Sequence, residues 1–363
     1  MTVKRVGFVL CSNQAQPIPS TRIAALKMMP FLATFGVRPF ILFEPQHPNE
    51  TPDLTGVTER AIEQGCDVVV LQKVHGPSAV QLARQLSASG VGTVFLVCDM
   101  VDIAMSEATD ATVVVTDYLK SLYPVVLQSK IHVVHDGIEQ PHQCKDHLIP
   151  LARTEGESLR AVLVTSASLD RLPVLVRPPA WLRVRIVGQY ESGLRRIRQI
   201  GWTWRAQPPH GRLDYLRFLV DRRIECVQWG AQRVYGEMML ADVGVIPIEL
   251  SLASSANGLT DARLVKSENR LTMKMSMGLP VVATAIPSYE SVIDQGVNGF
   301  LARSRHDWSA CLAALRDSGL RREMGLAARA SVTRRFSMEA QAAKLATVLM
   351  ALPSQLSDRQ ARP

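Results

Sequence analysis

The sequence predicts an α/β protein with two Rossmann-like domains, each built on a parallel β-sheet that is covered by helices on both faces. The chain has 363 residues, which exceeds the size at which a single hydrophobic core keeps growing. Short apolar runs alternate with segments of helical apolar spacing in both halves, and this alternation is typical of parallel sheets wrapped by helices. Together, the two observations predict two α/β domains of ordinary size.

The first half contains six apolar runs separated by helical patterns. The expected strands lie at residues 6–10, 38–43, 67–71, 93–97, 111–116 and 131–138. The expected helices lie at residues 21–35, 57–64, 78–89 and from 117 onward. Ligands of such folds bind beyond the carboxyl ends of the strands, so polar side chains that directly follow a strand are candidate site residues.

The second half repeats the alternation after a polar segment with scattered Pro and Gly. Its expected strands lie at residues 161–166, 182–188, 224–229, 242–248 and 279–284, and its expected helices at 213–220 and 233–240. We therefore predict a first domain at 1–142, a linker at 143–158 and a second domain at 159–336. Ser337 can cap a last helix at 337–352, and the tail at 353–363 is expected to be disordered.

The charge is distributed unevenly along the chain. Residues 1–142 contain 10 Lys and Arg against 13 Asp and Glu, a net charge of −3, whereas the remainder contains 31 against 20, a net charge of +11. The second half is therefore the part that attracts anions. Its scattered arginine pairs show no zinc spacing, RNA-binding motif or aromatic interleaving, so we expect no nucleic-acid partner. Such pairs suit a solvated surface or loose attachment to anionic lipid headgroups.

Composition and targeting patterns indicate the expected location. No apolar run approaches the roughly 20 residues of a membrane span, and the apolar run after Arg5 is too short for a signal peptide. We expect a cytoplasmic protein, with peripheral association at the inner face of the membrane as a secondary expectation. The six cysteines lie far apart without a C-x-x-C pair, which indicates reduced, structural thiols.

The segment KSENR places cations at the start of a helix, where they oppose the helix dipole. Ser267 is a good N-cap residue, which would place Lys266, Asn269 and Arg270 on one face at the helix start. Free backbone N–H groups there, with Lys, Arg and Asn donors, suit a phosphate group. The alternative is that Glu268 and nearby carboxylates neutralise a solvated turn.

The region from Lys266 to Leu301 resembles the donor site of nucleotide-sugar glycosyltransferases with the GT-B fold, of the family-four or group-one type. Residues 273–278 match the family's helix, residues 279–284 its P-V-V-A-T strand, and Glu290, Gly296, Gly299 and Leu301 follow in step. The family's paired glutamates would fall at Val265 and Met273, so neither is present. The K-S-x-N-R pattern resembles a variant subgroup in which Lys, Asn and Arg contact the donor diphosphate.

This resemblance implies two Rossmann-like domains whose sheets face a central cleft, with a C-terminal helix that crosses back to the first domain. It implies donor contacts from the second domain. The expected donor-binding residues are Lys266, Ser267, Asn269, Arg270, Ser288, Tyr289, Glu290 and Gly188.

Polar residues after the strands of the first half are the candidates for acceptor binding and catalysis. Ser20 or Thr21 can cap the helix after the first strand, and Arg22 in its first turn is expected either to contact substrate or to bond a nearby carboxylate. Four more candidates follow the third and fourth strands and can position or deprotonate an acceptor hydroxyl: Lys73, His75, Asp99 and Asp102. Asp102 can instead cap the next helix, and His75 can form a turn.

The expected function is transfer of a sugar from a nucleotide-sugar donor to a glycan, lipid-linked or small-molecule acceptor, in cell-surface polysaccharide or glycoconjugate synthesis. The nucleotide sugar is a substrate, and no cofactor or metal is expected, because this fold type uses side chains and a helix end at the diphosphate. Two alternatives stay open: a nucleotide-sugar epimerase or phosphorylase of the same fold, and a catalytically inactive sugar-nucleotide-binding scaffold.

Overall fold

The computed structural model describes residues 3–145, 158–165, 169, 177–248 and 263–352, and these divide into two compact units. Unit 1 comprises Met1–Glu139, Asn257–Asn269 and Arg335–Pro363, and unit 2 comprises Gln140–Ala256 and Arg270–Arg334. Within the described residues, each unit is built on a six-stranded sheet, and every strand pairing in the two sheets is parallel. The predicted α/β class with parallel sheets is confirmed.

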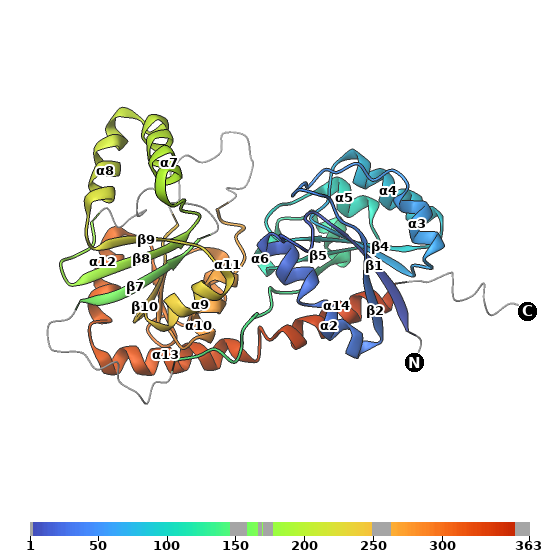
Figure 1. The fold of residues 1–363 in the computed structure, drawn as a ribbon. Helices are drawn as coiled ribbons and strands as arrows, with labels where there is room; N and C mark the ends of the chain where they lie inside the picture. The colour runs from blue at the N-terminus through green and yellow to red at the C-terminus, as the bar shows by residue number, and fades with distance from the viewer. Residues whose placement is uncertain (1–2, 146–157, 166–168, 170–176, 249–262, 353–363) are drawn as a thin grey trace, which may run out of the picture. The chain divides into compact units, whose positions relative to one another are not determined.

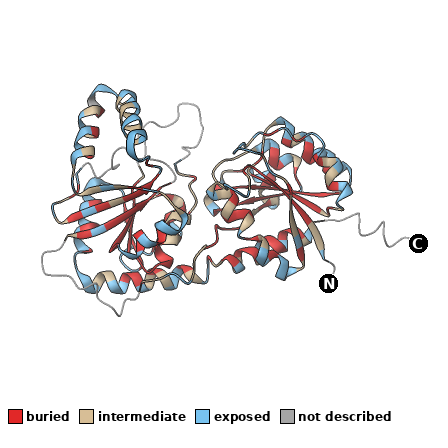
Figure 2. Cartoon of the chain, in the orientation of Figure 1, coloured by how far each residue is buried: buried red, intermediate tan, exposed pale blue. Residues whose placement is uncertain are grey.

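The sheet of unit 1 has the strand order β2-β1-β3-β4-β5-β6. Its strands are β1 Lys4–Leu10, β2 Val37–Phe43, β3 Val68–Gln72, β4 Gly92–Val97, β5 Ala111–Val114 and β6 Ile131–Val133. Both faces are buried, since Val69 and Leu71 of β3 pack in one core cluster while Val68 and Val70 pack in another. Continuous apolar runs therefore form the strands, and Figure 2 shows them as the buried centre of the unit.

Helices cover the two faces of this sheet in two groups. One face carries α3 Val57–Glu63, α4 Pro77–Ala88, α5 Ile103–Ala108, α6 Asp117–Ser121 and the 3-10 helix η3 Val125–Lys130. The other carries α1 Pro19–Thr21, the π-helix η1 Arg22–Leu26, α2 Met29–Leu32, the 3-10 helix η2 Ala33–Phe35 and α14 Met338–Ala351. Ser337 caps α14 by accepting a hydrogen bond from the Ala340 amide at 3.1 Å, as predicted.

The single helix predicted at 21–35 is wrong in detail. The segment begins at Pro19 and changes from α to π geometry at Arg22, then to α at Met29 and to 3-10 at Ala33. Pro30 lacks an amide hydrogen, so it cannot continue a regular helical ladder from the preceding turn. The N-cap residue is Ile18, with no side-chain cap hydrogen bond. The predicted cap by Ser20 or Thr21 is therefore also wrong.

The sheet of unit 2 has the strand order β12-β11-β10-β7-β8-β9. Its strands are β7 Leu159–Val164, β8 Leu182–Gly188, β9 Ile224–Gln228, β10 Val243–Ile246, β11 Val281–Thr284 and β12 Phe300–Ala302. Its helices are α7 Gly193–Ala206, α8 Pro209–Val220, α9 Ala231–Met239, α10 Asn269–Ser276, α11 Pro287–Glu290, α12 Arg305–Ala314 and α13 Ser318–Thr333. Helices α8, α12 and α13 pack on one face, while α9 and the end of α10 pack on the other.

The units are not continuous in sequence. The segment whose described part is 263–269 groups with unit 1, although it lies inside the domain predicted at 159–336. The first unit's opening segment ends at Glu139, three residues before the predicted boundary at 142. Most of the predicted linker, residues 146–157, and the predicted tail, 353–363, lie outside the described residues.

Candidate functional site

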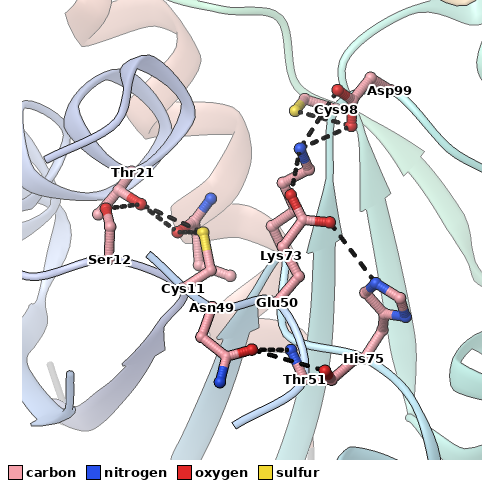
Figure 3. Close-up of polar contacts among 11 residues, drawn as sticks. Cys11, Ser12, Thr21, Asn49, Glu50, Thr51, Lys73, His75, Cys98 and Asp99 are labelled. Carbon is pink, nitrogen blue, oxygen red and sulfur yellow. Dashed lines mark hydrogen bonds and ion pairs between the residues drawn. The ribbon is translucent and has the colours of Figure 1, made fainter. Parts of the chain in front are cut away.

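A cluster of charged side chains lies at the carboxyl ends of β3 and β4 in unit 1 (Figure 3). Lys73 Nζ lies 2.8 Å from Glu50 Oε1 and 3.2 Å from the Asp99 carboxylate. Strands β3 and β4 pair in parallel register, so the residues that follow them meet at the same edge of the sheet. The structure thus brings together Lys73 and Asp99 as the sequence predicted, and it adds Glu50.

Lys73 is held in an unusual backbone conformation. Its φ of 56° makes it the single non-glycine residue with positive φ in the described part of the chain. Its amide donates to the Leu96 carbonyl at 2.8 Å, which ties the turn after β3 to β4. Such strain costs about 1–3 kcal/mol and is concentrated at functional sites. This conformation aims the ammonium group at the two carboxylates.

The Lys73 ammonium stays charged at neutral pH. Burial by itself would lower the pKa of Lys73, but the nearby Cys98 sulfur and the carboxylates of Glu50 and Asp99 outweigh burial, so this pKa is raised. Lys73 can therefore supply a fixed positive charge, but it cannot accept a proton from a substrate. The candidates for a general base beside it are therefore Asp99 and His75.

His75 and Asp102 complete the group. His75 Nε2 lies 3.6 Å from Glu50 Oε2, and His75 Nδ1 lies 3.7 Å from Asp102 Oδ2. Asp102 is the N-cap residue of α5 and accepts a hydrogen bond from the Met105 amide at 2.9 Å. The structure therefore gives Asp102 the capping role that was one of its two predicted interpretations.

A cluster of buried hydroxyl groups lies next to the charged cluster. Thr21 Oγ1 donates to Gln72 Oε1 at 2.9 Å and accepts from Ser12 Oγ at 2.8 Å, as Figure 3 shows for the labelled pair. Both threonine and serine are fully buried. These bonds fix the start of η1 against the ends of β1 and β3. Ser20, a predicted cleft residue, is half-buried in α1.

Arg22 forms a bidentate ion pair with Glu139 within unit 1. Its Nε donates to Oε1 at 2.7 Å and its Nη2 donates to Oε2 at 3.0 Å. Bidentate arginine–carboxylate pairs are among the stronger charged contacts in proteins. The carboxylate contact that was one of the two expectations for Arg22 is thus present, and it ties η1 to the segment after β6.

A second cluster of titratable side chains lies after β6 in unit 1 and includes His135 and Asp136. His135 Nδ1 lies 2.6 Å from Glu268 Oε1 and 2.9 Å from the Val115 carbonyl oxygen. Burial raises the pKa of Asp136 to about 7, assisted by the charge of Glu268 and opposed by a hydrogen bond from Ser267. Glu268 is thus buried in unit 1 and is not in a solvated turn.

The predicted start of the donor helix requires correction. Helix α10 begins at Asn269, whereas the Ser267 hydroxyl bonds Asp136. The prediction of Ser267 as the cap residue, with Lys266 on the helix face, is therefore wrong, because Glu268 and not Ser267 directly precedes the first helical residue. Asn269 and Arg270 do lie in its first turn. Gly278 follows the helix with a φ of 78°, a left-handed conformation that favours glycine.

Helix α10 contains a buried lysine that the sequence did not single out. Lys274 is fully buried, and its Nζ donates to the Arg270 carbonyl oxygen at 3.1 Å. Burial, assisted by the charge of Arg270, lowers the pKa of Lys274 to about 7. An anion near the start of α10 would therefore favour the protonated form of Lys274, which lies one turn after Arg270.

The remaining donor candidates lie at the carboxyl ends of unit 2 strands. The Ser288 hydroxyl in α11 is buried and has no hydrogen-bond partner among the described residues. Glu290 forms an ion pair with Arg303 at 2.6 Å. Tyr289 is fully buried, and the Gly188 carbonyl at the end of β8 accepts from the Trp229 amide at 2.7 Å. Ser288 is the donor candidate with unused hydrogen-bonding capacity.

Several contacts could not be anticipated from the sequence. Glu50 lies in a segment without a motif, Glu139 directly follows the strand expected at 131–138 but was not a candidate, and Lys274 occupies an ordinary position of a helical pattern. The partners of Glu50 and Glu139 lie far away in sequence, so only the fold places these two contacts. Across the described ranges, no three His, Cys, Asp or Glu side chains are placed to hold a metal ion. No helix in the described part of the chain has the length and apolar character needed to cross a bilayer.

Comparison with solved structures finds the same fold in several proteins. HepE from Anabaena in complex with UDP and glucose matches with a TM-score of 0.67 and 12% identity, over 96% of this chain and 100% of that one. A glycosyltransferase from Rickettsia africae ESF-5 matches with a TM-score of 0.65 and 12% identity, over 97% and 100%. Sucrose-phosphate synthase from Thermosynechococcus elongatus gives 0.65 and 12%, over 96% and 98%.

The architecture is therefore that of the GT-B glycosyltransferases: two α/β units with parallel six-stranded sheets. No protein-family model and no curated protein sequence matches this chain. The likeness is one of fold, at an identity of 12%.

Proposed function

We propose that this protein is a glycosyltransferase that moves a sugar from a nucleotide-sugar donor to a glycan, lipid-linked or small-molecule acceptor. The observation that carries the proposal is the fold match over nearly the whole chain to HepE, which has been solved with UDP and with UDP-glucose. The proposed donor is therefore a uridine diphosphate sugar. The proposed setting is cell-surface polysaccharide or glycoconjugate synthesis.

The donor diphosphate is proposed to bind at the start of α10. Asn269 and Arg270 lie in the first turn of this helix, where backbone N–H groups favour an anion. The buried hydroxyl of Ser288 follows β11 at the same edge of the sheet and has hydrogen-bonding capacity to offer. Lys266 and Ser267, which precede the helix, remain proposed donor contacts. Charge neutralisation by these groups would stabilise the leaving diphosphate without a metal ion.

The acceptor or transferred sugar is proposed to meet the charged cluster of unit 1. Asp99 or His75 would accept the proton of the attacking hydroxyl, because a carboxylate and an imidazole are the side-chain groups that commonly act as general bases. Lys73 would hold the Asp99 carboxylate in place through their ion pair of 3.2 Å. Asp102 would act through His75, from which it lies 3.7 Å away.

The proposal is tested by incubating the protein with UDP-sugars and following the products by mass spectrometry. Transfer or hydrolysis of the donor is expected, with UDP released. Conversion of the sugar without release of UDP would identify an epimerase instead. Binding of UDP-sugars without any turnover across a broad set of acceptors would identify an inactive scaffold. A thermal-shift screen finds the donor first, because a ligand at about 100 times its Kd adds about 2.7 kcal/mol of stability.

We also propose a cytoplasmic location with peripheral association at an anionic membrane surface. The uneven charge supports this, because residues 143–363 contain 31 Lys and Arg against 20 Asp and Glu. A basic surface is attracted to the anionic lipids of the inner leaflet. A lipid-linked acceptor would then be presented at the same surface as the enzyme.

A further inference from the structure

A hollow in unit 2 is lined by an excess of arginine side chains. It has a volume of about 450 Å³, and the described residues that line it include five arginines and two glutamates, a net charge of +3. The arginines are Arg160, Arg183, Arg185, Arg222 and Arg223. A concave site of this size fits a small molecule, and its positive charge favours an anion.

The alternation of side chains along β8 turns its arginines to the face of the sheet that α9 covers. The core cluster on the opposite face contains Leu182, Val184 and Ile186. The residues between them, Arg183 and Arg185, therefore point to the α9 face. Figure 1 shows β7, β8 and β9 side by side in this sheet. All the lining arginines but Arg185 lie at or before the amino ends of these strands, whereas Ser288 of the proposed donor site follows the carboxyl end of β11.

Two of the arginines lie opposite each other on neighbouring strands. Arg160 of β7 and Arg183 of β8 are partners in the parallel register. Neighbouring strands lie about 4.8 Å apart, and side chains at paired positions point to the same face. Like charges at directly opposite positions destabilise a sheet. An anion bound between the two guanidinium groups would remove this repulsion.

The carboxylates near the hollow are already paired with other arginines. Arg185 forms ion pairs with Glu225 and with Glu237. Arg223 pairs with Asp221 at 2.6 Å. Three lining arginines form neither an ion pair nor a side-chain hydrogen bond with any described residue: Arg160, Arg183 and Arg222. Three guanidinium groups at one hollow therefore have hydrogen-bond donors available for a ligand.

We propose that this hollow binds the phosphate group of a small molecule or of a lipid headgroup, at a place separate from the proposed donor site. Guanidinium groups bind phosphate oxygens through paired hydrogen bonds, and arginine stays charged at every physiological pH. A nucleotide is a poorer ligand, because the described lining contains no aromatic ring on which a base could stack. Phosphate binding at the hollow does not depend on sugar transfer.

Calorimetric titration of the full chain with pyrophosphate tests the proposal. Pyrophosphate also suits the proposed donor site, so we expect two binding sites in the wild type. The hollow variant Arg160→Gln/Arg183→Gln/Arg222→Gln should bind pyrophosphate at least about tenfold more weakly at one of them, with its affinity for UDP unchanged. Arg183→Gln alone should weaken the same site by a smaller factor. The Tm of the free hollow variant should be unchanged or raised, because repulsion between paired arginines is removed.

A matched control separates the hollow from net charge. Arg305→Gln/Arg322→Gln/Arg334→Gln removes the same charge from exposed positions elsewhere on unit 2, and it should bind pyrophosphate like the wild type. Flotation with phosphatidylcholine vesicles, with and without phosphatidic acid, identifies the source of the phosphate. Binding to the phosphatidic acid vesicles that is lost only in the hollow variant would identify a lipid headgroup. Pyrophosphate binding without vesicle binding would identify a soluble ligand.

Three results would overturn the phosphate site. These are unchanged binding of both pyrophosphate and vesicles in the hollow variant, equal losses in the hollow variant and the control, or a parallel loss of UDP affinity in the hollow variant. A single pyrophosphate site in the wild type that the hollow variant loses would contradict the proposed donor site and leave the hollow assigned. Circular dichroism confirms that each variant is folded, and Arg183→Gln carries the test if the triple variant is not.

Discussion

Replacement of Lys274 by methionine should stabilise unit 2, by an amount that depends on pH. Burial lowers the pKa of Lys274 from 10.5 to about 7, assisted by the charge of Arg270. Below pH 7 the lysine is protonated in both the folded and the unfolded state, so the folded state bears the full cost of a buried charge. Between pH 7 and 10.5 only the unfolded state is protonated, so stability rises with pH in this window.

The size of the effect follows from the pKa difference. A shift of one pKa unit corresponds to 1.36 kcal/mol, so the cost at or below pH 7 is about 5 kcal/mol as an upper limit. Lys274→Met retains the length and the packing of the side chain while it removes the charge. We expect a gain of a few kcal/mol near pH 6 that declines by about 1.4 kcal/mol per pH unit above pH 7.

Urea unfolding followed by tryptophan fluorescence measures this gain in unit 2 specifically. All five tryptophans of the chain belong to that unit: Trp181, Trp202, Trp204, Trp229 and Trp308. Arg322→Met, at an exposed position of α13, is the control and should change stability little at any pH. A gain that does not vary with pH, or a loss of stability in Lys274→Met, would refute the assignment of a buried, uncompensated charge.

Three further predictions concern unit 1. Burial raises the pKa of Asp136 to about 7, so the stability of the folded state falls as the pH rises from about 4 to 7. Asp136→Asn should therefore raise Tm near pH 8 and leave Tm almost unchanged near pH 4. Thermal unfolding followed by circular dichroism measures this difference. Asp102→Ala should cost about 1 kcal/mol in urea unfolding whereas Asp102→Asn should cost less, because Asn keeps the cap acceptor; equal costs would exclude capping. Asp99→Asn should lower turnover by about tenfold or more with UDP affinity unchanged; parallel losses of stability and turnover would make Asp99 a structural residue.

The sheets were predictable because their strands are continuous apolar runs. LRVRIVG was expected to form the strand 182–188, and β8 is Leu182–Gly188. Helix α7 was missed, because GLRRIRQIGWTWRA has arginines around the helix, no buried residue and two tryptophans of low helix propensity. The broken helix after β1 was also missed, since the apolar spacing at 21–35 does not distinguish α from π geometry.

The site could be predicted only where it follows from the sheet. Lys73 and Asp99 follow adjacent parallel strands, so their approach was expected, whereas Glu50 comes from a segment between β2 and α3 that carries no motif. Ser267 was assigned as a cap because its residue type favours that role. In the structure a tertiary contact with buried Asp136 wins over that local preference.

Titration of the protein with UDP, comparing Arg270→Ala with the wild type, tests the proposed donor site most directly. Removing Arg270 takes away a charge-assisted hydrogen bond to the diphosphate, worth about 1.5–3 kcal/mol, and it relieves repulsion of Lys274 in the free protein. We expect UDP affinity to fall by about tenfold or more, with the Tm of the free protein unchanged or slightly raised, and no change in Arg322→Ala. Intact UDP affinity with a large loss of stability would contradict the proposed donor site at the start of α10.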